Sequence, residues 1–130
     1  ITAFDMDRGE ILWQVAHGET PDSVRNNPAL RGVTLPRTGQ SGAVGALITK
    51  TLVVAGDPLA TTMPGRARGA MLRAYDKASG REVGTVLMPA PQSGTPMTYA
   101  IDGRQFLVVA VSGGNYSGEY IAYALPGGAR

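Results

Sequence analysis

Apolar residues along this chain gather in short runs, separated by clusters of glycine, proline, asparagine and aspartate. Short apolar runs bounded by turn-forming residues predict β-strands. We expect nine strands, in groups of two, four and three. Their sequences are ITAFD and EILWQV, then GALIT, TLVVAG, LRAYD and REVGTV, and finally PMTYAI, QFLVVAVS and YIAYALP. The segment PDSVRNNPALRG carries two prolines and two asparagines, and we expect it to be a loop rather than a helix.

Two of these runs do not alternate between apolar and polar residues. LVVA and FLVVAV are continuous apolar stretches at residues 52–55 and 106–111. A strand with one face in water shows a period of two, so continuous runs indicate strands that are covered on both faces. Blades that stack around a propeller satisfy this requirement. A small β-sandwich is the alternative, and its strands would alternate more clearly.

The chain also repeats itself. AFDMDRGEILW at residues 3–13 matches AYDKASGREVG at residues 74–84, and a third copy begins at Ala122 and Tyr123. Ala122 lies 48 residues after Ala74, while an extra loop at 17–42 lengthens the first spacing. A unit of roughly 45–50 residues is the size of one four-stranded propeller blade.

Each copy has the chemistry of a tight hairpin. Asp5 and Asp76 can accept hydrogen bonds from backbone amides just ahead of them, which starts a turn. Gly9 and Gly80 can adopt the positive φ that closes it. We therefore expect both aspartates to have a structural rather than a catalytic role.

Composition narrows the possibilities further. The chain has 130 residues, enough for one core, and no cysteine, which excludes disulfides and thiolate chemistry. Its net charge of +2 comes from scattered basic residues without interleaved aromatics, so we expect no nucleic-acid partner. No apolar run reaches the roughly 18 residues of a membrane helix. The start at Ile1 suggests a piece of a longer protein.

Three segments of the chain resemble a known protein family. AFDMDRGEILW is similar to the tryptophan-docking motif Ala-x-Asp-x-x-Thr-Gly-x-x-x-Trp of the quinoprotein dehydrogenases, with Arg8 in place of Thr. The second copy has Ser79 at that position and Gly84 in place of Trp. Residues 93–126, from SGTPMTY to YALP, are similar to the closing blade of membrane glucose dehydrogenases and related quinoprotein dehydrogenases.

The resemblance implies an all-β fold, a partial β-propeller of about two four-stranded antiparallel blades from an eight-bladed ring. Residues 1–15 would form a half blade, residues 43–88 a full blade with an insert loop at 57–69, and residues 95–125 a closing blade without its outer strand. The remaining blades of the parent chain are then the expected partners. Without them, exposed apolar faces and strand edges predict self-association.

The resemblance also implies the chemistry, which is oxidation of an alcohol or sugar hydroxyl in the periplasm, with or without a membrane anchor on the parent. The parent would use pyrroloquinoline quinone and calcium, whereas the chain alone is expected to bind neither and to be inactive. We assign no catalytic base and no metal ligand to this chain. The alternative function is a non-catalytic propeller of the same repeat type that serves as a scaffold for protein assembly.

Two glycine-rich segments are the candidates for cofactor contact. In SGGNYSG, residues 112–118, the amides of Gly113 and Gly114 and the side chain of Asn115 can approach a flat polar ligand. In TGQSG, residues 38–42, the candidate is Gln40. The alternative for the first segment is a simple glycine turn, and for the second an ordinary loop.

Two further residues have competing interpretations. Trp13 is expected to pack in the core against a neighbouring blade rather than to bind a ligand, with small Ala3 and Ala74 admitting its ring. His17, the single histidine, lies in a polar loop, and without a second histidine nearby we expect neither a metal site nor a catalytic dyad.

Overall fold

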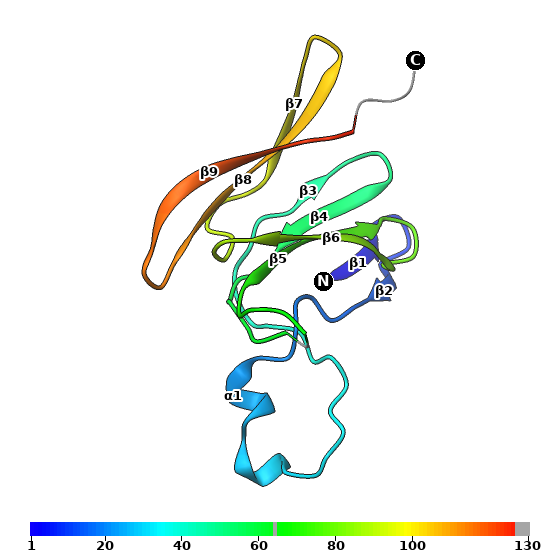
Figure 1. Cartoon of the computed structure of the whole chain (residues 1–130). Coiled ribbons are helices and arrows are strands. Elements are labelled where there is room, and N and C mark those ends of the chain that lie inside the picture. The colour runs from blue at the N-terminus through cyan, green and yellow to red at the C-terminus, as the bar shows by residue number, and fades with distance from the viewer. Residues whose placement is uncertain (64, 127–130) are drawn as a thin grey trace.

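The computed structural model describes residues 1–63 and 65–126, and the regular secondary structure of this part is almost entirely β-strand. Three antiparallel sheets follow one another along the chain (Figure 1). The first is the hairpin of β1 (Thr2–Asp5) and β2 (Glu10–Gln14). The middle sheet has the order β3 (Leu47–Ile48), β4 (Leu52–Gly56), β5 (Ala70–Asp76) and β6 (Glu82–Met88). The last has the order β7 (Met97–Ile101), β8 (Arg104–Gly113) and β9 (Tyr116–Ala124).

This arrangement confirms the expected partial propeller, with strands grouped two, four and three among the described residues. All neighbouring strands are antiparallel and consecutive, as in the meander of a propeller blade. How the three sheets divide into the blades of a complete ring stays a prediction.

The two repeated hairpins have the same turn. The amide of Gly9 donates to the carbonyl of Asp5 at 2.7 Å, and that of Gly80 donates to the carbonyl of Asp76 at 2.8 Å. Both glycines have positive φ, +70° and +72°. The Asp5 carboxylate accepts from the amides of Asp7 and Arg8, whereas that of Asp76 accepts from the amide and hydroxyl of Ser79. The structural role expected for both aspartates is therefore visible in their hydrogen bonds.

The core lies between the middle sheet and the last sheet. Its buried residues are Val54, Ala70, Leu72, Met88, Ala90, Val109 and Val111. The run LVVA is buried from Val53 to Ala55, as its continuous apolar pattern predicts. In β8, however, Val109 and Val111 are fully buried while Phe106 and Val108 on the opposite face are only half-buried. Within the described chain, β8 thus has one fully covered face.

The segment 21–32 contains two single helical turns where the sequence predicted only loop. These are α1 (Asp22–Arg25) and the 3₁₀ turn η1 (Pro28–Leu30). Pro28 sits at the start of the second turn, where its missing N–H costs nothing, and the Asn27 side chain accepts a hydrogen bond from the amide of Ala29. The loop that carries both turns extends beyond one end of the middle sheet (Figure 1).

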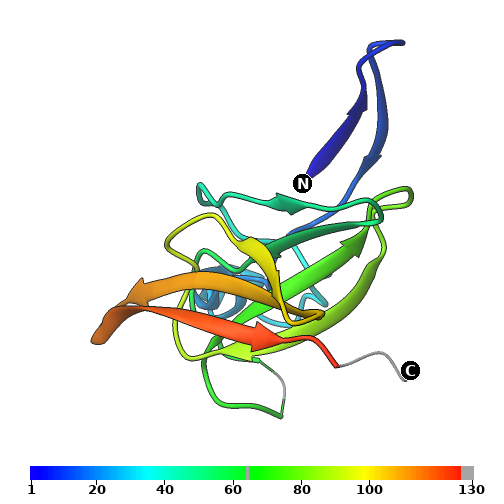
Figure 2. The same cartoon turned by 90° about the horizontal axis from the view of Figure 1, so that it is seen from above.

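Large apolar side chains are exposed on the outermost strands. Seen from above, the β1–β2 hairpin projects away from the two larger sheets (Figure 2). Phe4 and Ile11, which are cross-strand partners in this hairpin, are 55% and 60% exposed. Tyr120 on β9 is 82% exposed. Among the described residues, no helix has the length and apolar character needed to cross a membrane.

Candidate functional site

A pocket of about 820 Å³ lies where the ends of the middle and last sheets meet the loops between them. Four segments far apart in the sequence line it: the start of α1, the loop between β4 and β5, the proline-rich link between β6 and β7, and the turn between β8 and β9. Pro58, Ala90 and Pro91 contribute apolar surface, while Gln92 and Asn115 contribute amides. A wall that combines apolar surface with polar groups is found at small-molecule sites.

Three of the four predicted cofactor residues line this pocket. Gly113, Gly114 and Asn115 form the turn that joins β8 to β9. Gly113 has φ +135° and Gly114 has φ +60°, conformations that side-chain-bearing residues rarely adopt. A Cβ at Gly114 would meet no atom within 4 Å, so its glycine serves the backbone conformation and leaves the turn open to a ligand.

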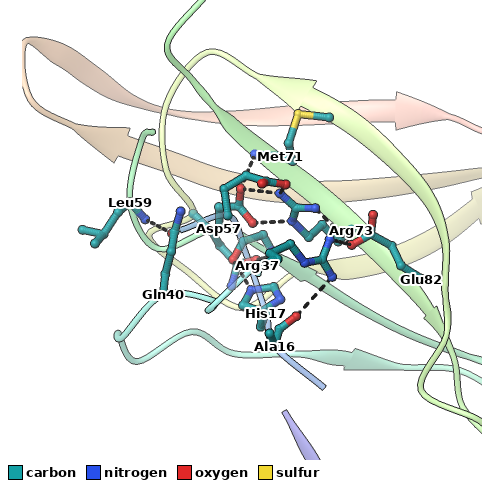
Figure 3. A network of polar contacts seen from close by, with 12 residues as sticks. Ala16, His17, Arg37, Gln40, Asp57, Leu59, Met71, Arg73 and Glu82 are labelled. Carbon is teal, nitrogen blue, oxygen red and sulfur yellow. Dashed lines mark hydrogen bonds and ion pairs between the residues drawn. The ribbon is translucent and has the colours of Figure 1, made fainter. Parts of the chain in front are cut away.

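Gln40 lies behind the pocket wall and is not a lining residue. Its side-chain oxygen accepts a hydrogen bond from the amide of Leu59, which does line the pocket, at 3.0 Å (Figure 3). Its Nε2 is buried and has no partner among the described residues. Gln40 thus supports the pocket loop and keeps one unpaired donor beside it.

An ion pair stands at another side of the pocket. The Nε of Arg68 donates to Asp22 Oδ2 at 3.2 Å, and the amide of Thr62 donates to Asp22 Oδ1 at 2.9 Å. The hydrogen bond from the Thr62 amide, helped by Arg68, lowers the pKa of the Asp22 carboxyl. These contacts join the extra loop at 17–42 to the excursion at 57–69.

Next to the pocket, a buried ionic network holds the same loops (Figure 3). Arg73 on β5 is 2% exposed and Asp57 at the end of β4 is fully buried. Arg73 donates from Nε to Asp57 Oδ1 at 2.6 Å and from Nη2 to Oδ2 at 3.1 Å. Such a bidentate pair has a fixed geometry, and it orients the Asp57 carboxylate to accept from the amide of Met71 as well.

Further carboxylates complete the surroundings of Arg73. Its Nη1 donates to Glu82 at 3.0 Å and its Nη2 to Glu19 at 3.2 Å. Burial alone would lower the pKa of Arg73, but the hydrogen bonds and charge of Asp57 and Glu82 outweigh burial and raise it. Arg37 bridges Glu82 to the carbonyl of Ala16, which fastens the start of the extra loop.

His17 is buried in this region, although the sequence placed it in a polar loop. Its Nδ1 is 2.9 Å from the Tyr75 hydroxyl and its Nε2 is 3.1 Å from the carbonyl of Gly56. Because the carbonyl can only accept, Nε2 carries the proton, and Nδ1 accepts from Tyr75. Burial lowers the pKa of His17 and raises that of Tyr75 to about 12, so both are neutral near pH 7.

Little in the local sequence predicts this network. Arg73 stands inside the apolar strand AMLRAYD and Asp57 directly follows LVVAG, and a charge within an apolar run is the one local sign of a buried pair. Their partner Glu19 is distant in sequence, Glu82 lies on the next strand, and neither residue carries such a sign. Neither they nor the link residue Gln92 can be identified from composition or spacing.

No group of three or more histidine or acidic side chains that could hold a metal is found in the described part of the chain. The carboxylate of Asp57 is fully engaged with Arg73 and Met71, and those of Asp5 and Asp76 hold turns.

Residues 1–107 match a family model described as the glucose/ethanol/alcohol dehydrogenase β-propeller domain, which is associated with pyrroloquinoline quinone. The chain belongs to this family. The predicted relationship to the quinoprotein dehydrogenases is thereby confirmed.

Relatives within this quinoprotein dehydrogenase family cover nearly the whole chain. It is 29% identical over 131 residues to quinoprotein glucose dehydrogenase A of Acinetobacter calcoaceticus, covering 97% of this chain and 15% of that protein. It is 30% identical over 135 residues to quinate/shikimate dehydrogenase (quinone) of Acinetobacter baylyi, with 96% and 15% covered. The glycerol dehydrogenase large subunit of Gluconobacter thailandicus is 31% identical over 132 residues, with 97% and 16% covered.

The chain therefore spans about one sixth of the length of these curated relatives. No solved structure gives a significant match to it.

Three observations indicate that the pocket of this quinoprotein propeller segment can accommodate a flat, polar cofactor. The glycine turn at 113–114 leaves its backbone uncovered, proline and alanine surfaces face the same space, and Asn115 supplies an amide. A flat ring system can lie on the apolar surfaces while its oxygens bond the amides.

Proposed function

We propose that this chain is the C-terminal part of a dehydrogenase that depends on pyrroloquinoline quinone and oxidises the hydroxyl of an alcohol or sugar. The family match over residues 1–107 carries this proposal. The curated relatives support the substrate class, because their names include glucose, quinate or shikimate, and glycerol dehydrogenases. All of these substrates are polyhydroxylated small molecules, so a polyol or sugar is the substrate class that we propose.

In this proposal the residues of the chain bind and orient, and they carry no proton-transfer step. A quinone held there would supply the two-electron oxidation, as the acceptor of the electrons released when the substrate loses one hydrogen from the hydroxyl oxygen and one from the carbon that bears it. Gly113 and Gly114 offer backbone amides, Asn115 offers its side-chain amide, and Gln40 holds Leu59 in the wall. Calcium ligands and the catalytic base come from other blades of the parent, which would lie in the periplasm.

A titration of the full-length protein with pyrroloquinoline quinone and calcium tests the proposal. We expect saturable binding, and turnover in a dye-coupled assay across alcohols, polyols and aldoses. The isolated chain, which lacks most of the ring, is expected to show no turnover in the same assay. Absence of binding by a folded full-length protein would instead favour the scaffold alternative and reduce the 112–118 segment to a glycine turn.

A further inference from the structure

We propose that Gln92 is a positioning residue that fixes the β8–β9 turn, residues 112–118, against the end of the middle sheet. Gln92 lies in the proline-rich link between β6 and β7 and is 7% exposed. The inference deepens the proposed function, because this turn is the one assigned to contact the cofactor.

On one side, both ends of the Gln92 carboxamide form hydrogen bonds, one to β4 and one to the residues before β3. Its Oε1 accepts from the amide of Gly56 at 2.6 Å, and its Nε2 donates to the carbonyl of Gly45 at 2.8 Å. Its own amide donates to the carbonyl of Asp57 at 3.0 Å. Because one end must accept and the other must donate, only one orientation of the amide satisfies both contacts.

Close packing restricts the position of the Gln92 side chain. A Cβ at Gly56 would lie 2.8 Å from the Cβ of Gln92 and 2.8 Å from Cε of Met88. Real side chains do not approach so closely, so glycine at position 56 is what lets Gln92 reach the backbone. The carboxamide is therefore held by sterics as well as by hydrogen bonds.

On its other side, the same short segment pairs with β8. Gln92 forms a β-bridge with Val111. The carbonyl of Pro91 accepts from the amide of Ser112 at 3.0 Å, and the amide of Ser93 donates to the carbonyl of Ala110 at 2.9 Å. These bonds end at Ser112, directly before Gly113.

Gln92 thus joins two sheets at the point where the turn begins. Its side chain binds β4 and the residues before β3, while its backbone and its two neighbours bind β8. The glycines that follow have few steric restraints of their own, so the placement of their amides depends on how Ser112 is held. Loss of the carboxamide contacts is expected to loosen the turn.

The test compares Gln92→Glu and Gln92→Met with Gln105→Glu in the full-length protein. Gln92→Glu keeps the shape and the acceptor for Gly56, but it replaces the donor to Gly45 by a carboxylate oxygen that faces the Gly45 carbonyl in a buried site. Gln92→Met loses both bonds. Gln105 is an exposed glutamine on β8 itself, where its Nε2 donates to the hydroxyl of Thr98, and it serves as the matched control.

Two readouts are needed: amide hydrogen exchange of peptides covering 112–118 without cofactor, and the affinity for pyrroloquinoline quinone by fluorescence titration. We expect faster exchange in 112–118 for both Gln92 variants and cofactor affinity lower by roughly 10–100-fold, as for other supporting residues of bound groups. The Gln105 variant should match the wild type in both measurements.

A fall in thermal stability of Gln92→Glu with unchanged exchange in 112–118 and unchanged cofactor affinity would reduce Gln92 to a structural residue and overturn the inference. If the wild-type protein binds no quinone, the proposed function fails, and the exchange measurement alone then decides whether Gln92 positions the turn.

Discussion

Buried polar side chains make several of the long-range contacts in this segment, and His17 is the single histidine of the chain. It is neutral in the folded chain because Gly56 and Tyr75 satisfy both ring nitrogens in a buried site. Protonation would place a second hydrogen where the Tyr75 hydroxyl now donates, with a charge cut off from water. Folding therefore opposes protonation of this ring.

The first prediction is a loss of stability in mild acid that depends on His17. Above about pH 6.5 the ring is neutral in both the folded and unfolded states, so it makes no pH-dependent contribution. Below that value only the unfolded state binds the proton, because burial lowers the pKa in the folded state. The free energy of unfolding should then fall by up to about 1.4 kcal/mol per pH unit, until the pH passes the folded pKa.

Chemical denaturation of the full-length protein between pH 7.5 and 5, about the unperturbed histidine pKa, measures this slope. His17→Gln should flatten it. Gln14→Ala, which removes an exposed hydrogen bond to Thr2, should shift stability while leaving the slope unchanged. Equal slopes for the wild type and His17→Gln would contradict the prediction.

The second prediction concerns the buried Arg73–Asp57 pair. Arg73→Met leaves the Asp57 carboxylate buried without its cation, and we expect the free energy of unfolding to fall by about 3–5 kcal/mol. Asp57→Asn should also destabilise, since it leaves the guanidinium partly unpaired. The double variant should lose less than the sum of the two single losses, because neither charge then remains alone. Strict additivity in urea unfolding would show that the pair does not act as a unit.

At the scale of elements, the repeated hairpin also joins one sheet to the next. The indole Nε1 of Trp13 on β2 donates to the carbonyl of Lys77 in the β5–β6 turn at 3.0 Å. A Cβ at Gly80 in that turn would lie 2.6 Å from Cε3 of Trp13. The ring therefore lies against the turn of the following repeat, and glycine is required there for space as well as for its positive φ.

Gly80→Ala and Gly9→Ala form a matched pair that separates these two requirements. Both glycines have nearly the same φ, but a Cβ at Gly9 meets nothing within 4 Å. Gly9→Ala should cost about 1–2 kcal/mol for the backbone alone. Gly80→Ala should cost about 1–3 kcal/mol more, because the indole must move.

Thermal unfolding of both variants in the wild-type and Trp13→Ala backgrounds checks this prediction. Without the indole, the two glycine substitutions should have the same effect on stability. A difference that persists in the Trp13→Ala background would mean that the indole is not the obstacle at Gly80.

The elements that sequence predicted well are those fixed by neighbouring residues. The Asp–Gly spacing specifies the hairpin turns, and continuous apolar runs identify β4 and β8, because both signals lie within a few residues. His17, Gln92 and Glu19 were missed or misjudged because the groups that their side chains bond lie 36 or more residues away. Such contacts exist only once the sheets have packed, and a polar loop sequence does not reveal them.

In the candidate site, too, local sequence signals were predictive and long-range contacts were not. The glycine turn at Gly113 and Gly114 was recognisable from local sequence, and the structure places it on a pocket wall. Pro58 and Pro91 complete the pocket wall, and Gln40 lies behind it. These positions depend on how loops from two sheets pack together, and no local sequence pattern predicts that packing.

At the scale of the whole molecule, apolar surface remains where neighbouring sheets would pack. Phe4 and Ile11 form an exposed cross-strand pair on the first hairpin, and strands β1, β2, β7 and β9 end their sheets with an edge. A complete propeller packs such apolar faces between neighbouring blades and leaves only short, protected strand edges. The surface left open by this chain is thus of the kind that the remaining blades of a parent protein would cover.

The last prediction follows from that surface: the isolated chain should self-associate in a concentration-dependent way. Sedimentation velocity over a concentration series measures this directly. The double variant Phe4→Lys/Ile11→Lys should weaken association, because charges would replace the apolar pair at the open face. Val33→Lys is the control, since Val33 is equally exposed at 56% but lies in the extra loop, away from the sheets. A monodisperse monomer for the wild-type chain, or equal weakening by Val33→Lys, would show that the open blade face does not drive association.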